Sequence, residues 1–422
     1  MSFPIELVRD RFPALAVTDN GRRRVYFDAP GGTQACRASI ERMSHHLATG
    51  TANSGGAFAT SVSTDACSRD AHDAMADLLG GTREEIAFGP NMTSLTLAVS
   101  RALSRDWQPG DELIVTRLDH DANVAPWLAV AEDKGMTVRW LDFDPETGRL
   151  NLDSLPKLIS ARTKLVAVGG ASNALGTLND LPTIVNLVKA GSDALVYVDA
   201  VQSAPHVPMN VRAIGCDFLV CSPYKLFGPH AGVLWCKSEL AETIDAYKVR
   251  PASNRGAARF ETGTPSFEAQ AGVLGMVDYL DWLGSMVSVE TTRRQRILAA
   301  FEACVAYEKT LGDRFLTGIS RINSTRLFGP PTMTGRVPTF AFRLKGHSPR
   351  EVERHLAERG IFSWSGNFYA VETVAHLGLT DKGGLVRVGM CHYNTADEVD
   401  LLVTALGEIT GSVDPVGALT LK

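Results

Sequence analysis

The strongest constraint on this fold is an alternation of short apolar runs with helix-like segments between about residues 80 and 240. Runs rich in Val, Ile and Leu suit strands, and the longer segments between them suit helices. Several runs are apolar at four consecutive positions, as expected where helices cover both faces of a parallel sheet. The pattern predicts an α/β fold with a mainly parallel seven-stranded sheet, whose expected strands are 85–89, 112–116, 136–142, 164–169, 194–199, 217–221 and 232–236.

The chain has 422 residues, more than one hydrophobic core usually serves, so we expect two domains. A long helical stretch from about 280 to 312 precedes a smaller α+β unit, in which capping patterns at Ser348 and Thr395 mark two helices. The expected strands of this unit are 337–343, 361–364 and 385–390. The expected domains are a large one at 20–280 and a small one at 1–19 and 281–422.

Charge and composition exclude several classes of protein. The net charge of -5 leaves no basic excess to neutralise a phosphate backbone, so we expect no nucleic-acid partner. No apolar stretch approaches the roughly 20 residues that span a bilayer, and the N-terminus lacks a basic flank followed by an apolar run. We therefore expect a cytoplasmic protein without membrane association. The cysteines are scattered without metal-ligand spacing, which favours reduced thiols and no metal site.

Polar side chains follow four of the expected strands at the point where each strand ends. They are Asp199, Asn173, His120 and the segment from Ser222 to Lys225. Taken singly, each has an ordinary interpretation, because Asp and Asn often cap turns, a loop His usually has its hydrogen bonds satisfied locally, and a lone Lys is usually solvated. Because the carboxyl ends of parallel strands face one crevice, we expect these side chains to converge.

One cofactor accounts for this combination of residue types. Pyridoxal 5'-phosphate needs a lysine for a Schiff base, a carboxylate for its ring nitrogen, an aromatic face, a donor to its phenolic oxygen and phosphate donors at a helix N-terminus. A helix expected at about 92–104 supplies N–H groups at Met92 and Thr93. The sequence therefore predicts pyridoxal phosphate as the cofactor.

Two segments are specific enough to carry a family resemblance. Residues 221–229 read Cys-Ser-Pro-Tyr-Lys-Leu-Phe-Gly-Pro and follow an Asp-x-x-Gln segment that ends at Gln202, and residues 259–265 read Arg-Phe-Glu-Thr-Gly-Thr-Pro. From about Tyr26 to Leu406 the chain resembles the class V aminotransferase and cysteine desulfurase group of fold-type I pyridoxal-phosphate enzymes. The resemblance implies their fold, a large domain with a mainly parallel sheet and a smaller C-terminal α+β domain.

The resemblance also implies a role for each candidate residue. Lys225 matches the Schiff-base lysine that later moves the Cα proton, and Asp199 matches the partner of the ring nitrogen. His120 matches the residue that stacks on the ring, and these three form the expected catalytic set. Asn173 and Gln202 match donors to the phenolic oxygen. The expected cofactor-binding residues are Thr93, Met92, His120, Asn173, Asp199, Gln202, Ser222, Lys225 and Thr264.

Two further residues bear on partners. In the family, the threonine that matches Thr264 reaches the phosphate from the neighbouring subunit, which implies a homodimer. Arg387 lies among apolar neighbours on an expected strand and needs an anionic partner. That partner is either an internal carboxylate or, as the resemblance implies, the α-carboxylate of a small amino-acid substrate.

One loop departs from the desulfurase pattern. A cysteine desulfurase takes sulfur onto a mobile cysteine thiolate, and the corresponding loop here, residues 360–370, contains none. Tyr369 occupies the expected cysteine position, while Trp364 and Asn367 replace residues that are usually Arg and His. On a regular strand, Cys391 would face the same side as Arg387 about 13 Å further along. Cys221 lies at the end of a buried strand, a poor place for a mobile thiol.

The resemblance implies an enzyme that binds a small amino acid as an external aldimine and removes its Cα proton. We then expect C–S or other β-elimination, as in cysteine desulfurase-like proteins. An aminotransferase or an amino-acid epimerase is the alternative, since the placement of acids and bases decides the outcome. A dinucleotide-binding oxidoreductase would share the alternating pattern, but its Gly-x-Gly-x-x-Gly fingerprint is missing. A non-catalytic cofactor-binding homologue is disfavoured by the presence of Lys225.

Overall fold

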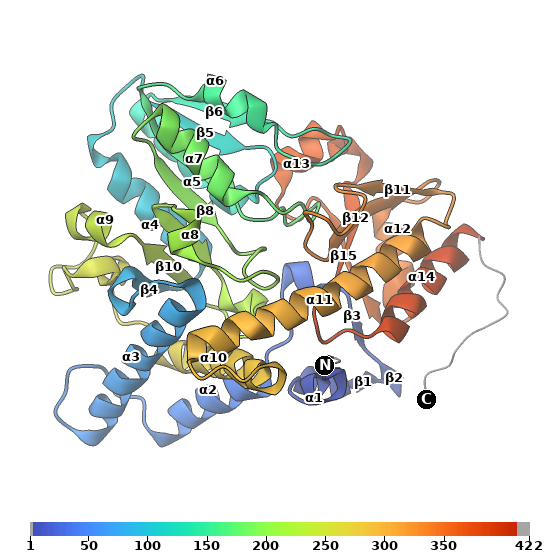
Figure 1. The fold of residues 1–422 in the computed structure, drawn as a ribbon, viewed down its shortest axis with the longest axis horizontal. Helices are drawn as coiled ribbons and strands as arrows, with labels where there is room; N and C mark the ends of the chain where they lie inside the picture. Colours follow the sequence, from blue (N-terminus) through green and yellow to red (C-terminus); the bar gives the residue numbers. More distant parts are fainter. Residues whose placement is uncertain (1–2, 412–422) are drawn as a thin grey trace.

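A seven-stranded sheet forms the centre of the larger part of the molecule (Figure 1). The structure, a computed structural model, describes residues 3–411. In chain order the strands of the sheet are β4 (Ile86–Gly89), β5 (Glu112–Thr116), β6 (Thr137–Leu141), β7 (Thr163–Gly169), β8 (Leu195–Asp199), β9 (Phe218–Cys221) and β10 (Gly232–Cys236). Their spatial order is β4-β10-β9-β8-β7-β5-β6. Only β10 runs antiparallel to its neighbours, so the expected mainly parallel sheet is confirmed.

Helices cover both faces of this sheet, because its strands bury side chains on both sides. Along β8, Val196 and Val198 belong to the hydrophobic core that includes α7, whereas Tyr197 packs into a second core with α4 and α5. The first helices are α1 (Ile5–Arg9), α2 (Arg37–Thr49), α3 (Ala59–Leu79), α4 (Met92–Leu103), α5 (Ala125–Lys134), α6 (Leu155–Leu158), α7 (Leu181–Gly191), α8 (Val211–Ile214) and α9 (Ser238–Thr243).

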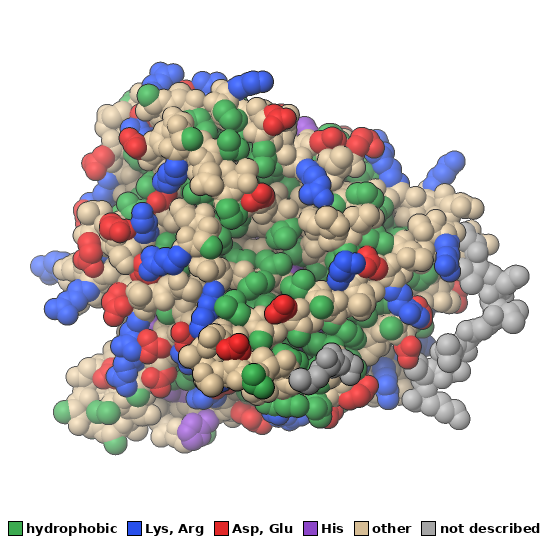
Figure 2. Space-filling view, in the orientation of Figure 1, with side chains coloured by type: hydrophobic (Ala, Val, Ile, Leu, Met, Phe, Trp, Pro, Cys, Tyr) green, Lys and Arg blue, Asp and Glu red, His purple; other side chains and the backbone are tan. Residues whose placement is uncertain are grey.

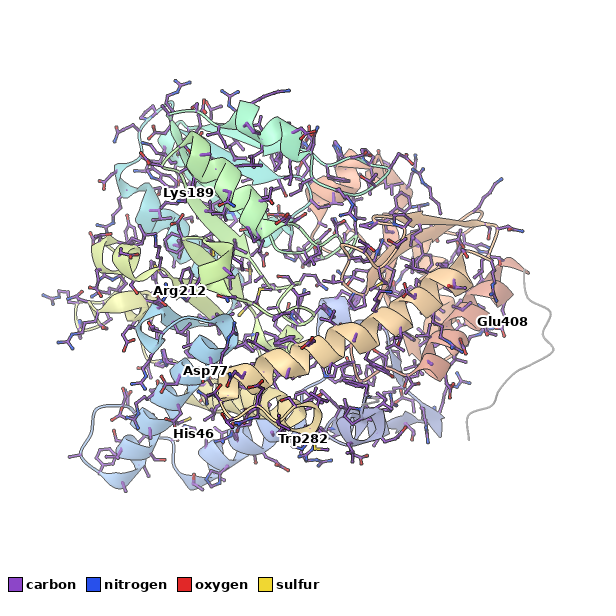
Figure 3. All side chains as sticks on the ribbon, in the orientation of Figure 1. His46, Asp77, Lys189, Arg212, Trp282 and Glu408 are labelled. Carbon is purple, nitrogen blue, oxygen red and sulfur yellow. The ribbon has the colours of Figure 1, made fainter. Side chains whose placement is uncertain are left out.

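The expected helical stretch from about 280 to 312 is wrong as a single element. It is a hairpin of α10 (Phe267–Val287) and α11 (Arg293–Ile319). Between the two helices the chain is not helical. Thr292 caps the N-terminus of α11, because its side chain accepts a hydrogen bond from the Gln295 N–H. The two helices pack so closely that a Cβ at Gly284 would lie 2.0 Å from the Arg296 carbonyl oxygen. Asp77 of α3, labelled in Figure 3, pairs with Arg293 at 2.6 Å and ties the hairpin to the large sheet's helices.

A second, smaller sheet follows the hairpin. It contains β11 (Thr325–Phe328), β12 (Thr339–Leu344), β15 (Leu385–Gly389) and β14 (Trp364–Gly366) in that antiparallel order. The expected strand at 361–364 is split, because β13 (Ile361–Phe362) pairs in parallel with β3 (Val25–Tyr26), whereas β14 pairs with β15. The sequence did not predict β11. The remaining helices are α12 (Pro349–Ala357), α13 (Val371–His376) and α14 (Ala396–Thr410).

Both expected capping patterns of the small unit are formed. Ser348 and Thr395 accept from the N3 backbone at the starts of α12 and α14, and the N3 glutamate side chain bonds back to each cap. The division into domains at residues 20 and 280 stays a prediction; strand β3 falls within its large domain but pairs with β13 of the small unit.

The outer surface carries mixed charge, with acidic and basic side chains interspersed over the face in Figure 2. Among residues 3–411, no helix is both long enough and apolar enough to cross a membrane.

Candidate active site

A cavity lies at the carboxyl ends of β5, β7, β8 and β9, the position where open α/β sheets bind ligands. Eight residues predicted from the sequence line it together: Met92, Thr93, His120, Asn173, Asp199, Gln202, Ser222 and Lys225. Asn91, Asp119 and Tyr224 also line the cavity, although sequence reasoning gave them no role. Asp119 follows β5 directly, so the same strand-end rule could have found it.

Among the residues that the structure describes, Lys225 is the only lysine that lines this cavity. It ends a short 3₁₀ turn, Pro223–Lys225, that follows β9, and its side chain is buried. Its Nζ lies 3.4 Å from Gln202 Oε1. Burial, and then the positive charge of Arg387, lower the pKa of Lys225 to about 7, while Asp199 opposes the shift. Part of this amine is therefore neutral near pH 7 and able to attack a carbonyl carbon or accept a proton.

Two buried carboxyl groups lie on the same cavity. Asp199 is the last residue of β8, and its Oδ1 accepts a hydrogen bond of 2.9 Å from the Val201 N–H. Burial raises the pKa of Asp199 to about 6, with the backbone bond and Lys225 opposing the rise. Burial likewise raises the pKa of Asp119 to about 7, although Asn123 Nδ2 donates to it at 2.7 Å. Pairing with a cationic ligand would lower both pKa values.

His120 presents an imidazole ring to the cavity. Its Nδ1 accepts from the Ala122 N–H at 3.0 Å, which fixes the ring at the start of a turn. Burial, followed by the charges of Lys225 and Arg387, lowers the pKa of His120 to about 3. The ring is therefore neutral near pH 7. The Tyr369 ring stacks on it, with centroids 5.6 Å apart and an interplanar angle of 23°.

Several buried polar atoms around the cavity have no hydrogen-bond partner within the described residues. They are Asn173 Oδ1, Ser222 Oγ and Arg387 Nε. Such atoms are rare in folded proteins because burying them unpaired costs free energy, so they favour a polar ligand. Gln202 Nε2, by contrast, already donates to Thr339 Oγ1 at 3.1 Å. With the amine and the carboxylate, this donor and acceptor set fits pyridoxal phosphate.

The N-terminus of α4 opens onto the cavity at Met92 and Thr93. Asn91 caps the helix, because its Oδ1 accepts from the Ser94 N–H at 2.8 Å. The Met92 and Thr93 N–H groups precede the capped position, and the helix dipole there favours an anion. This end of the cavity is therefore suited to a phosphate.

Arg387 is buried on β15 beside this cavity, although it does not line it. Its Nη1 donates to the Asn173 carbonyl oxygen at 2.9 Å, and its guanidinium lies 4.3 Å from the centre of the Phe368 ring. The internal salt bridge that the sequence left open does not form within residues 3–411, where no carboxylate oxygen lies within 4.0 Å of an Arg387 guanidinium nitrogen, although buried Asp28 acts on Arg387 electrostatically. Burial lowers the pKa of Arg387 to about 9, so the group remains a cation near pH 7 without a paired anion.

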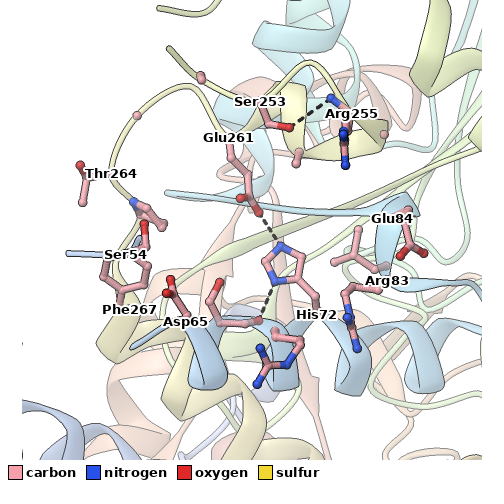
Figure 4. Close-up of a pocket in the computed structure, with 18 of the residues that line it drawn as sticks. Ser54, Asp65, His72, Arg83, Glu84, Ser253, Arg255, Glu261, Thr264 and Phe267 are labelled. Atoms are coloured by element: carbon pink, nitrogen blue, oxygen red, sulfur yellow. Dashed lines mark hydrogen bonds and ion pairs between the residues drawn. The ribbon is translucent and has the colours of Figure 1, made fainter. Parts of the chain in front are cut away.

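Thr264 lies apart from the other predicted residues. It is exposed and lines a separate hollow, shown in Figure 4. Its loop is held by Glu261, whose Oε1 pairs with His72 Nε2 of α3 at 2.7 Å and accepts from the Phe88 N–H at 2.8 Å. Within one chain, Thr264 is therefore presented outward at a fixed place and does not meet Lys225.

Within residues 3–411, no cysteine lines the Lys225 cavity. Cys221 is buried at the end of β9. Cys391 does not continue the Arg387 strand, because β15 ends at Gly389. Cys391 is buried, and burial raises its thiol pKa well above the ordinary value. Tyr369 is 72% exposed at the position where a desulfurase thiol was expected.

Comparison with known proteins extends over nearly the whole chain. The family described as aminotransferase class-V matches residues 25–402. A cysteine desulfurase of Serratia proteamaculans is 31% identical over 97% of this chain and 99% of its own. The apo structure of a cysteine desulfurase from Thermococcus onnurineus superposes with a TM-score of 0.87 at 25% identity, covering 98% of this chain and 99% of that one. The cysteine desulfurase CsdA of Escherichia coli gives 0.82 at 26% identity, covering 98% and 100%.

Proposed function

Because this chain belongs to the class V aminotransferase family of pyridoxal-phosphate-dependent enzymes, we propose that it removes the Cα proton of a small amino acid and eliminates a substituent from the β carbon. The cysteine desulfurase relatives support carbon–sulfur bond cleavage as the particular elimination. The observation that carries the proposal is the buried, partly neutral amine of Lys225 in one cavity with Asp199.

We assign the cofactor to the residues of this cavity. Lys225 would bind its aldehyde carbon, and Asp199 would pair with its ring nitrogen. His120 would lie against the ring, and Asn173 and Gln202 would face the phenolic oxygen. Ser222, Met92 and Thr93 would bind the phosphate. Pyridoxal phosphate, when bound, withdraws electrons from the substrate's Cα and so acidifies the Cα–H bond.

Side chains of the protein then accept the proton and bind the substrate. The neutral amine of Lys225 accepts the Cα proton, which its lowered pKa permits near pH 7. Arg387 holds the α-carboxylate, because it is a buried cation with an unpaired Nε. The clamp comes from the small sheet and contacts Asn173 of the large part, so the two parts of the molecule meet over the site.

The fate of the leaving group follows from the loop at Tyr369. A phenol cannot accept sulfur as a persulfide, and no cysteine lines the cavity. The sulfur therefore departs into solvent as free sulfide or a free thiol rather than onto the protein.

The quaternary structure is part of the same proposal. Thr264 is exposed on a loop that Glu261 and His72 hold in place, which suits a hydroxyl offered to the cavity of a second copy. A homodimer of this kind would work in the cytoplasm, where thiols stay reduced.

Absorbance and product analysis test the proposal. The purified enzyme should show an imine band in roughly the 410–430 nm region, which Lys225→Ala removes and Lys345→Ala, an exposed control, retains. With β-chloro-L-alanine, which carries a good leaving group, the enzyme should release pyruvate; with L-cysteine it should also release sulfide.

Each contrary result has a defined meaning. Amino-group transfer from L-alanine to a keto acid without pyruvate from β-chloro-L-alanine would make the enzyme an aminotransferase. Formation of a D-amino acid alone would make it an epimerase. An imine band without turnover of any of these compounds would make it a non-catalytic cofactor-binding homologue. All three results overturn β-elimination.

A further inference from the structure

Three aromatic side chains lie near Arg387 and His120: one contacts the guanidinium, one contacts the imidazole, and one lies opposite Arg387 in the sheet. They are Trp364 of β14 and Phe368 and Tyr369 of the loop that follows it, and we call them the aromatic rim. Trp364 is 48% exposed and Tyr369 is 72% exposed, so part of each ring is open to solvent. The mechanism above gives none of them a role.

Trp364 lies directly beside Arg387 in the small sheet. The two residues are opposite each other in the antiparallel pairing of β14 with β15, so their side chains share one face of the sheet. The indole also packs over Gly31, where an added Cβ would lie 2.6 Å from Trp364 Nε1. This contact orients the indole alongside the proposed carboxylate clamp.

Phe368 and Tyr369 are held over the site by their backbone. Both residues have positive φ angles, 57° and 58°, a strained conformation for bulky side chains. The Phe368 carbonyl accepts from Asn173 Nδ2 at 2.9 Å, and the Tyr369 carbonyl accepts from the Asp121 N–H at 2.7 Å. These bonds hold the Phe368 ring against Arg387 and the Tyr369 ring against His120.

From this arrangement we infer that the enzyme selects cysteines whose sulfur carries an apolar group, S-alkyl or S-aryl cysteines, over cysteine itself. The inference rests on the proposed β-elimination and on Arg387 as its carboxylate clamp. A substrate clamped at Arg387 would meet the Phe368 ring, which lies against the guanidinium, and would lie on the face of the small sheet that carries Trp364. An apolar substituent there leaves water and gains contact with the rings, whereas the hydrogen of a free thiol gains little.

The reaction balances without a sulfur acceptor on the protein. An S-substituted cysteine, R–S–CH2–CH(NH3+)–COO−, and one water give R–SH, pyruvate and NH4+. The C–S bond breaks with its electron pair going to sulfur, Lys225 takes the Cα proton, and water hydrolyses the three-carbon fragment. No oxidant or reductant is needed. A thiol leaving group also agrees with a tyrosine in place of the expected cysteine.

Steady-state kinetics test the preference. We expect kcat/KM for S-benzyl-L-cysteine to exceed that for L-cysteine by about tenfold or more, equivalent to about 1.4 kcal/mol. Trp364→Ala and Tyr369→Asn should reduce this ratio toward one by raising KM for the benzyl compound. Asn tolerates a positive φ better than most residues, so the second change removes the ring with little backbone cost. Tyr369→Phe is the matched control and should keep the ratio, because it keeps the ring.

Binding supplies a readout that does not depend on turnover. Calorimetry should show that 3-phenylpropionate binds the holoenzyme at least about tenfold more tightly than propionate, with the difference lost in Trp364→Ala. Equal affinities of the two acids, or a kcat/KM ratio at or below one, would overturn the inference. The release of pyruvate from β-chloro-L-alanine tests β-elimination independently of the aromatic rim. If pyruvate forms but the preference for apolar substituents is absent, the enzyme is still a β-eliminating enzyme and only the proposed role of the rim is wrong.

Discussion

At the scale of single residues, the site holds two cations that burial makes unfavourable. Burial and the nearby Arg387 lower the pKa of Lys225, and burial lowers the pKa of Arg387 itself. An anionic ligand relieves both costs, and the neutral form of Lys225 can bind a carbonyl carbon. The same two side chains therefore favour a cofactor that carries both an aldehyde and anionic groups. They also favour an amino-acid substrate, which brings a carboxylate.

Because of His120, the free energy of unfolding should depend on pH, and this can be measured on the cofactor-free protein. The pKa of His120 in the folded chain is about 3, against an ordinary 6.5. Between these values the unfolded chain holds a proton on this ring that the folded chain does not. Through His120, stability therefore rises with pH across this window and is constant above it.

The variant His120→Phe removes this contribution. We expect the wild type to gain stability relative to the variant by up to about 1.4 kcal/mol per pH unit between about pH 4 and 6. Urea denaturation at several pH values measures the difference. His45→Phe, at an exposed position of α2, controls for the loss of a histidine. Parallel curves for wild type and His120→Phe would contradict the prediction.

At the scale of secondary-structure elements, α4 combines a cap with an anion site. Asn91 satisfies the Ser94 N–H, which leaves the first N–H groups of the helix directed at the cavity. A continuous polar network at the N-terminus would compete with a ligand for these donors. The cap therefore stabilises the helix without closing the site.

Two neighbouring hydroxyl residues on this helix can be compared directly. Thr93 lines the Lys225 cavity, whereas Ser94 lines a different hollow. We expect Thr93→Ala to weaken pyridoxal phosphate binding by about tenfold, the effect of one hydrogen bond to a charged group. Ser94→Ala should leave binding unchanged. Titration of the cofactor-free protein, followed by absorbance, measures both; equal effects of the two changes would contradict this placement of the phosphate.

At the scale of the whole molecule, the site joins two sheets. Lys225 and Asp199 come from the large sheet, and Arg387 comes from the small one. Asn173 links them, because its carbonyl accepts from Arg387 and its amide donates to the Phe368 carbonyl. Asn173 of the large part therefore fixes both the clamp and the Phe368 backbone of the aromatic rim.

A mixed dimer tests whether Thr264 acts on a second copy. When Lys225→Ala and Thr264→Ala chains are co-expressed with different tags, a Thr264 that acts across the interface leaves one intact site in each mixed dimer. Activity at limiting cofactor should then be about half that of the wild type, because a two-fold dimer has two equivalent sites. If Thr264 acts within its own chain, both sites carry a defect and activity stays at or below that of the Thr264→Ala homodimer.

The sequence alone was enough to predict the seven strands of the large sheet, each to within one residue, and the caps of α12 and α14. These features depend on local periodicity and on side chains that bond to their own backbone a few residues away. The strand-end rule also predicted which polar residues would share one cavity.

Tertiary packing decided the rest. Strand β11 and the split between β13 and β14 depend on which other segment each one meets. The contact of Tyr369 with His120 and of Phe368 with Arg387 joins segments remote in sequence, and no local pattern encodes it. Local propensity acts over a few residues, whereas the surroundings of the substrate clamp are set by the packing of one sheet against the other.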